Sequence, residues 1–209
     1  MSYREPARIS ARRTRSTILA ALVVVSAVLV GVVGYQLSAV SSSPATTSPI
    51  GAEPRHGALG EADGAVPDGT TVFDDELPAV ANLDPALLGA LRRAATDAAV
   101  DGVELFVDSG WRSPAYQEQL LREAVAKYSS EEEAARWVAT PDTSAHVSGD
   151  AADIGHADAT AWLSDHGAGY GLCQTYGNEP WHYELRPEAV DHGCPPMYAD
   201  PTHDPRIKG

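Results

Sequence analysis

The chain has 209 residues, 44% of them hydrophobic, which is enough for one domain of ordinary size with additional segments. It carries 29 acidic and 15 basic residues, a net charge of −14 at pH 7. The first 16 residues hold five Arg and one Glu, a net +4, so the rest of the chain carries −18. Phosphates would repel so acidic a domain, which argues against a nucleic-acid partner.

The N-terminal quarter is organised like a membrane anchor. The basic segment 1–16 precedes an apolar run at 17–37, and no charged residue lies at 16–52. The run has about the 20 residues that cross a bilayer, and the preceding Arg residues favour a cytoplasmic N-terminus. We therefore expect a cytoplasmic tail at 1–16 and a single-pass anchor at 17–40 in the cell membrane, with an extracytoplasmic remainder. The alternative is secretion after signal cleavage, but the run exceeds the roughly 7 to 15 residues of a signal h-region.

Composition divides the rest of the chain into three parts. Residues 41–70 are rich in Ser, Pro, Thr, Gly and Ala, which is typical of a flexible stalk. A folded domain is predicted at 71–198. A Pro-rich tail at 199–209 is predicted to be irregular.

Two longer helices are predicted from their start signals. Asp84 and Pro85 supply an N-cap and a first-turn proline, and apolar residues then recur on one face as far as Ala98. Ser113 and Pro114 begin a second helix in the same way. Its predicted apolar stripe consists of Leu120, Leu121, Ala124 and Val125.

Shorter elements are predicted around these helices. Strands are expected at 103–108 and 181–185, and short helices after the capping residue Ser130 and at 158–167. Strands separated unevenly by helices favour an α+β domain. We expect a small, mostly antiparallel sheet with helices packed on one side.

Cys173 and Cys194 are the two cysteines of the chain. In an oxidising compartment a lone pair usually forms a disulfide, which here would close a loop of about 20 residues. Two free buried thiols are the alternative. The spacing excludes a C-x-x-C redox or zinc-ribbon motif.

Two pairs of residues could carry chemistry. His146 and Asp153 are seven apart, with Gly149 between them as a possible turn, and Glu179 and His182 are three apart. Two imidazoles and one carboxylate would leave one open position on a tetrahedral zinc, as in catalytic sites. A second carboxylate that is not a ligand could act as general base.

The order of these motifs resembles a known family. The run Ser144-x-His146-x-x-Gly149-x-Ala151-x-Asp153 is preceded by SGWRS at 109–113 and followed by Glu179-x-Trp181-His182. This pattern is similar to that of the zinc D-alanyl-D-alanine carboxypeptidases and dipeptidases linked to vancomycin resistance, the VanY-like D,D-peptidases. Their relatives include the L-alanyl-D-glutamate endopeptidases of bacteriophage. The similarity spans roughly 71–198, and it implies a zinc site at the sheet.

The resemblance implies a role for each matching position. The matching zinc ligands are His146, Asp153 and His182. Glu179 matches the catalytic base, which takes a proton from the attacking water and hands it to the leaving amine. Arg112 matches the arginine that contacts the substrate carbonyl and steadies the developing oxyanion, a role suited to a planar cation with several donors. Ser144 binds substrate or holds the loop of His146.

The resemblance also implies a function. We expect a monomeric zinc D,D-carboxypeptidase that removes the terminal D-Ala of peptidoglycan stem peptides. The alternatives are a D,D-dipeptidase, a peptidoglycan endopeptidase, or a catalytically silent wall-binding module, against which the non-ligand carboxylate of Glu179 argues. Ala145 stands where relatives often carry a polar residue, which leaves substrate preference open. His156 and Glu184 are interpreted as ordinary surface or core residues.

Overall fold

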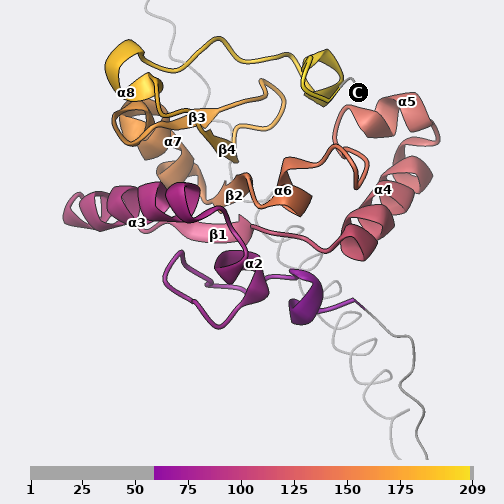
Figure 1. Ribbon diagram of the computed structural model, residues 1–209, viewed down its shortest axis with the longest axis horizontal. Helices are drawn as coiled ribbons and strands as arrows, with labels where there is room; N and C mark the ends of the chain where they lie inside the picture. The colour runs from indigo at the N-terminus through magenta and orange to yellow at the C-terminus, as the bar shows by residue number, and fades with distance from the viewer. Residues whose placement is uncertain (1–58, 208–209) are drawn as a thin grey trace, which may run out of the picture. The chain divides into compact units, whose positions relative to one another are not determined.

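A four-stranded sheet lies at the centre of the computed structural model, which describes residues 59–207 (Figure 1). Its strands, in the order β1-β2-β4-β3, are β1 (Phe106–Ser109), β2 (Ala151–Gly155), β4 (His182–Leu185) and β3 (Leu172–Gln174). Each neighbouring pair is antiparallel. The predicted combination of helices with a small antiparallel sheet is therefore confirmed.

Seven α-helices and three 3-10 turns are described around the sheet. The helices are α2 (Pro78–Ala81), α3 (Pro85–Val100), α4 (Pro114–Tyr128), α5 (Glu131–Ala135), α6 (Ala145–Ser148), α7 (Ala157–His166) and α8 (Ala189–His192). The 3-10 turns are η1 (Glu61–Asp63), η2 (Gly167–Tyr170) and η3 (Pro201–His203). In Figure 1, α3 and α7 lie together beside the sheet, whereas α4 and α5 lie apart from them, beyond α6.

Helix α3 forms as predicted and supplies much of the core. The Asp84 side chain accepts hydrogen bonds from the backbone N–H groups of Ala86 and Leu87, which caps the helix. Its inner face then packs against the sheet and α7. The buried residues of α3 are Leu87, Ala90, Leu91, Ala94, Ala95 and Ala98.

Helix α4 also begins where predicted, but its apolar stripe does not enter the core. Ser113 caps the helix by accepting from the Tyr116 N–H. Only Gln117 and Ala124 are buried along this helix, and Leu120 is half-buried because it lines a cleft. Helix α4 therefore serves as a wall of that cleft and contributes little to the packed interior.

Strand β1 begins at Phe106, three residues later than predicted. The Val103 N–H still donates to the Ala98 carbonyl, at 3.0 Å, so this residue belongs to the turn that ends α3. Gly102, with φ of +77°, makes that turn. Residues 103–105, although rich in strand-forming residues, thus form the end of this turn and the connection that leads into β1.

The shorter predicted elements are present, with shifted ends. Ser130 caps α5 by accepting from the Glu133 N–H. Helix α7 starts at Ala157, one residue before the prediction, and stops ahead of Gly167. Strand β4 starts at His182, one residue after the prediction.

The described residues extend beyond the predicted domain at both ends. At 59–70 the chain forms η1, and the Asp63 carbonyl accepts from the Ser113 N–H at 2.8 Å. Beyond residue 198, Asp200 and Asp204 are buried. The predicted cytoplasmic tail, anchor and most of the stalk lie outside the described residues. Among residues 59–207, no helix combines the length and apolarity needed to cross a membrane.

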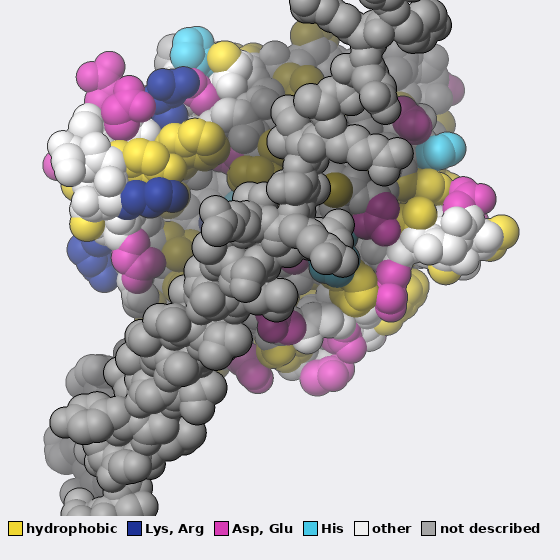
Figure 2. Space-filling model, turned by 180° about the vertical axis from the view of Figure 1, so that it is seen from behind, with side chains coloured by type: hydrophobic (Ala, Val, Ile, Leu, Met, Phe, Trp, Pro, Cys, Tyr) yellow, Lys and Arg dark blue, Asp and Glu magenta, His cyan; other side chains and the backbone are white. Residues whose placement is uncertain are grey.

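The acidic excess of the sequence is visible on the surface. On the face drawn in Figure 2, Asp and Glu side chains are spread over much of the described part. Lys and Arg side chains gather mainly at one end, on the side of α4 and α5. The negative charge is therefore distributed over this face and is not confined to one patch.

Candidate functional site

Two of the predicted ligands are set by the register of the sheet. Asp153 on β2 lies directly opposite His182 on β4 in the antiparallel pairing. Directly opposite residues place their side chains on the same face of a sheet, with Cβ atoms about 4.5–5.5 Å apart. Backbone hydrogen bonding therefore brings this carboxylate and this imidazole together.

A glycine turn brings the third residue to them. His146 lies on the single turn of α6, which ends at Gly149 with φ of +82°. A Cβ at Gly149 would stand 2.4 Å from the Asn82 carbonyl oxygen, so both conformation and space require glycine here. The predicted turn at Gly149 is present, and it returns the chain to β2 so that His146 faces Asp153.

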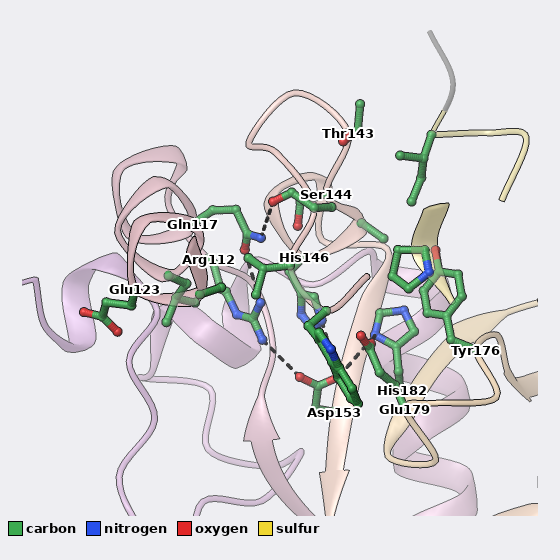
Figure 3. A pocket seen from close by; sticks show the side chains of 18 of the residues that line it. Arg112, Gln117, Glu123, Thr143, Ser144, His146, Asp153, Tyr176, Glu179 and His182 are labelled. Carbon is green, nitrogen blue, oxygen red and sulfur yellow. Dashed lines mark hydrogen bonds and ion pairs between the residues drawn. The ribbon is translucent and has the colours of Figure 1, made fainter. Parts of the chain in front are cut away.

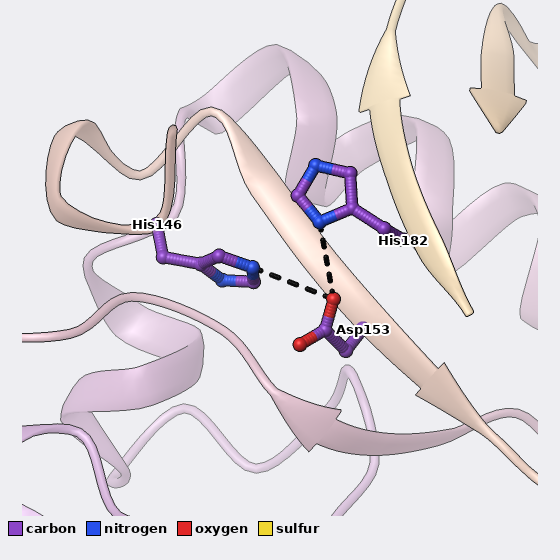
Figure 4. Close-up of side chains that lie close together, drawn as sticks. All are labelled: His146, Asp153 and His182. Carbon is purple, nitrogen blue, oxygen red and sulfur yellow. Dashed lines mark hydrogen bonds and ion pairs between the residues drawn. The ribbon is translucent and has the colours of Figure 1, made fainter. Parts of the chain in front are cut away.

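Three potential ligand atoms converge at this point (Figure 4). Oδ1 of Asp153 lies 3.4 Å from Nε2 of His146 and 3.2 Å from Nδ1 of His182. The ligand atoms of the three residues all lie within 4.8 Å of one another, and all three side chains are buried. In residues 59–207 this is the one cluster of His, Cys, Asp or Glu with such spacing.

The hydrogen bonds of the two histidines fit a metal site. Nδ1 of His146 lies 2.8 Å from the Gly110 carbonyl oxygen, which can only accept. The ring hydrogen is therefore on Nδ1, and the lone pair of Nε2 is directed at the cluster. Nε2 of His182 faces a carboxylate oxygen of Glu184 at 3.3 Å, which leaves Nδ1 for the cluster. Outer partners that fix the tautomer in this way are typical of metal-binding histidines.

Glu179 supplies a buried carboxylate beside the cluster. Its Oε2 lies 3.8 Å from Nδ1 of His182, and none of residues 59–207 hydrogen-bonds its Oε1. Burial raises the pKa of this side chain to about 7. A buried oxygen without a partner is costly, and such atoms often mark a chemical role. The loop between β3 and β4 thus holds an acid–base group at the site.

Arg112 is held beside the cluster by three side chains. Its Nη2 pairs with Oδ2 of Asp153 at 3.0 Å, and its Nε donates to Oγ of Ser109 at 2.8 Å. Its Nη1 donates to Oε1 of Gln117 at 3.1 Å, and Gln117 in turn donates to the Ala139 carbonyl. A planar cation is therefore fixed in orientation at the edge of the cluster.

All predicted site residues other than the cysteines line one cleft of about 580 Å³ (Figure 3). They are Arg112, Ser144, His146, Asp153, Glu179 and His182. Ser144 precedes α6, but its side chain makes no capping hydrogen bond. The exposed rings of Trp137 and Trp181 also line the cleft, as do Pro201 and Ile207 of the C-terminal segment.

The surroundings of the two histidines shift their pKa values in opposite directions. Burial alone would lower the pKa of His182, but Asp153 and Glu184 on its two sides raise it to about 9. Burial also opposes ionisation of Asp153, yet His146 and His182 hold the pKa of this carboxyl well below its usual value. Burial and Arg112 lower the pKa of His146, which favours the neutral form that binds metals.

Glu184 is a core residue, one of the two readings that the sequence allows, and it is not part of the ligand cluster. Its contacts with the site are not foreseen by that reading. Its side chain is 2% exposed and accepts from His182, Arg186 and Arg206. A usable signal was present, because residues two apart in a strand share a face and the sequence predicts a strand at 181–185. The contact with Arg206, which is 22 residues away, carries no such signal.

A disulfide joins Cys173 and Cys194, as expected from the sequence, with Cα atoms 5.6 Å apart. Beyond Cys194, the Tyr198 N–H donates to the Thr175 carbonyl and the Tyr198 carbonyl accepts from the Gly177 N–H. The bridge therefore tethers a segment that pairs with the loop of Glu179.

A Cys173→Ser variant is expected to lower both the melting temperature and the rate of the peptidase activity that the sequence predicts. Opening a loop of about 20 residues removes roughly 3 kcal/mol of stability in the chain-entropy model, and the loop of Glu179 loses its tether. Calorimetry and rate assays on the full chain would measure this. Cys194→Ser is the matched control and should behave alike, because either change opens the same bridge. Unchanged melting and activity in both variants would contradict the expectation.

Comparison with known proteins gives a consistent family signal. Residues 81–188 match the family VanY, D-alanyl-D-alanine carboxypeptidase. A D-alanyl-D-alanine carboxypeptidase of Enterococcus faecalis is 31% identical over 140 residues, covering 53% of this chain and 52% of the relative. The chain thus spans about half the length of this curated relative.

Similar solved structures include two of VanY proteins. VanYB in complex with D-alanine-D-alanine is 27% identical, with a TM-score of 0.48, and the match covers 53% of this chain and 74% of that one. A mutant of the vancomycin resistance D,D-pentapeptidase VanY in complex with Zn(II) is 29% identical, with a TM-score of 0.46 and coverage of 49% and 72%. The LD-carboxypeptidase LdcB is 25% identical, with a TM-score of 0.49 and coverage of 61% and 71%.

Proposed function

The chain belongs to the VanY family of D-alanyl-D-alanine carboxypeptidases, and we propose that it is a zinc-dependent D,D-carboxypeptidase acting on peptidoglycan stem peptides. The observation that carries this proposal is the convergence, in one cleft, of a buried two-His, one-Asp cluster with the Glu179 carboxylate, whose Oε1 has no hydrogen-bond partner among residues 59–207. A structural zinc site would have four protein ligands and no need for the free carboxylate.

Three residues would hold the metal. His146 would offer Nε2, Asp153 would offer Oδ1 and His182 would offer Nδ1. A Zn²⁺ ion bound there would act as a Lewis acid that polarises the scissile carbonyl and acidifies the attacking water.

Glu179 carries the proton through the reaction. Its free Oε1 accepts a proton from the water as the water oxygen bonds to the carbonyl carbon of the penultimate D-Ala. The same carboxyl group then donates that proton to the amine of the terminal D-Ala as the C–N bond breaks. The products are free D-Ala and a stem peptide that is one residue shorter.

Arg112 and Ser144 position the substrate in this proposal. Because three side chains fix the guanidinium, Arg112 stabilises the negative charge that develops on the carbonyl oxygen without reorganising. Ser144 lies on the cleft and its hydroxyl is not used as a helix cap, so it is free to hydrogen-bond the peptide.

The proposal is tested by incubating the purified full chain and zinc with a stem pentapeptide, then identifying products by mass spectrometry. Release of single D-Ala residues is expected. Release of the D-Ala-D-Ala dipeptide would instead indicate a dipeptidase, and cleavage within the stem or cross-bridge an endopeptidase. Binding of the peptide without any cleavage would indicate a silent wall-binding module.

We also propose that the protein is anchored in the cell membrane by residues 17–40, with its catalytic domain outside the cytoplasm. The apolar run in the sequence supports the anchor, and the Cys173–Cys194 disulfide supports an oxidising compartment.

Cell fractionation followed by protease treatment of intact spheroplasts is expected to find the chain in the membrane fraction, with its C-terminal domain degraded. Recovery of the chain in the culture medium would support the alternative of a cleaved signal peptide. A membrane-bound chain protected from the protease would contradict the orientation.

A further inference from the structure

We propose that Glu184 is a positioning residue that orients His182 toward the metal, and that Arg206 of the C-terminal segment holds Glu184 in place. The inference rests on the proposed zinc function. It concerns contacts on the far side of His182, away from the reacting atoms.

Glu184 contacts the imidazole on the side opposite the cluster. Nδ1 of His182 faces Asp153, whereas Nε2 lies 3.3 Å from Oε1 of Glu184. Figure 4 shows that the second ring nitrogen of His182 points away from Asp153. His182 and Glu184 lie on the same face of β4, and the cleft of the site is lined by His182 but not by Glu184. Glu184 is therefore placed to direct the ring and is not placed to touch substrate.

The carboxylate of Glu184 is itself fixed by arginines. Arg206 donates through Nη1 to Oε2 at 2.6 Å and through Nη2 to Oε1 at 3.3 Å. Arg186 donates to Oε2 at 2.7 Å. The forked contact from Arg206 reaches both oxygens, so it sets the plane of the carboxylate as well as its charge.

Arg206 is in turn anchored by a buried carboxylate. Its guanidinium pairs with Asp204, which is fully buried and also accepts from the hydroxyl of Tyr176 at 3.1 Å. The Tyr176 ring lies 5.0 Å from the His182 ring, measured between centroids. The C-terminal segment and the proposed metal ligand are thus linked by one continuous set of contacts.

The experiment measures zinc affinity of the full chain by competition with a chromophoric chelator. Glu184→Gln is expected to weaken zinc binding by about 10- to 100-fold, the usual cost of losing an outer partner of a metal-binding histidine. Arg206→Ala should weaken it in the same direction. The double variant should bind zinc no more weakly than Glu184→Gln, because Arg206 acts through Glu184. The visible spectrum of the cobalt-substituted protein should change with Glu184→Gln, since the ring orientation changes.

Arg136→Ala is the matched control. Arg136 pairs with Asp200 at 3.0 Å and so ties the same C-terminal segment down without touching Glu184 or His182. The zinc affinity of Arg136→Ala is expected to stay within twofold of that of the wild type. If Arg136→Ala and Arg206→Ala weakened zinc binding equally, the effect would come from docking of the C-terminal segment and not from Glu184. That result would overturn the proposal.

Folding of each variant is followed by circular dichroism. If Glu184→Gln does not fold, the zinc affinity of Arg206→Ala becomes the test. This variant is expected to fold, because Arg206 is half-exposed and its removal leaves Asp204 bonded to Tyr176 and to the backbone. Wild-type affinity in Arg206→Ala then overturns the inference. A wild-type chain that binds no zinc would refute the proposed function itself, whereas zinc binding that is equal in wild type and Glu184→Gln would refute only this inference.

Discussion

A Glu179→Gln variant is expected to release D-Ala at least about 1,000-fold more slowly than the wild-type chain while binding zinc equally well. The carboxylate is buried beside the cluster, and none of residues 59–207 hydrogen-bonds its Oε1, so no packing role accounts for its charge. An amide of the same shape cannot accept the proton of the water. Single-turnover assays with the pentapeptide and measurement of bound zinc would separate the two effects.

Glu132→Gln is the control for this substitution. It makes the same chemical change at an exposed position on α5, outside the cleft, and should leave the rate unchanged. Because burying a carboxylate is costly and none of residues 59–207 hydrogen-bonds its Oε1, Glu179→Gln should be no less stable than the wild type. A rate within tenfold of the wild type would rule out Glu179 as the base.

An Asp153→Asn variant is expected to lose zinc and, with it, all detectable release of D-Ala. Asp153 gives Oδ1 to the cluster and Oδ2 to Arg112, so the change weakens the metal site and removes the anionic partner of a buried guanidinium. Loss of a ligand should exceed the 10- to 100-fold cost of losing an outer partner. Removing one member of a buried ion pair also costs about 3–5 kcal/mol of stability, so melting should fall.

Metal content and activity of Asp153→Asn should be compared with those of Asp150→Asn. Asp150 is exposed, lies three residues earlier and pairs with Ser148, so its amide variant should keep zinc and activity. Adding excess zinc to Asp153→Asn should recover little of the rate. Wild-type zinc affinity in this variant would exclude Asp153 as a ligand.

Local signals in the sequence predict the parts of the fold that depend on neighbouring residues. The caps of α3 and α4 are such cases, because Asp84 and Ser113 bond to N–H groups two or three positions away. Helices of four residues and the three-residue strand β3 lack enough periods to be detected. The strand predicted at 103–108 is longer than β1, because composition alone does not reveal that Val103 is held by the end of α3.

The candidate site also has residues that the sequence predicts and residues that it does not. The motifs identify the residues around the cluster, since their chemistry and order are recognisable in the chain. The partners that orient them are missed, because Gln117 and Arg206 reach the site only through the tertiary fold. Glu184 is intermediate, since strand periodicity places it on the face of His182 but does not say what holds it.

The turn at Gly149 has a consequence for how this protein tolerates changes in length. Its carbonyl accepts from the Asp84 N–H at 2.8 Å, and a Cβ at this position would stand 2.4 Å from the Asn82 carbonyl oxygen, so the turn is fastened to the start of α3. One residue inserted between this turn and Asp153 would slip β2 by one position and move that side chain to the other face of the sheet. Insertions and deletions between 146 and 153 should therefore be absent from active relatives, and length differences should fall in the connections away from the cleft.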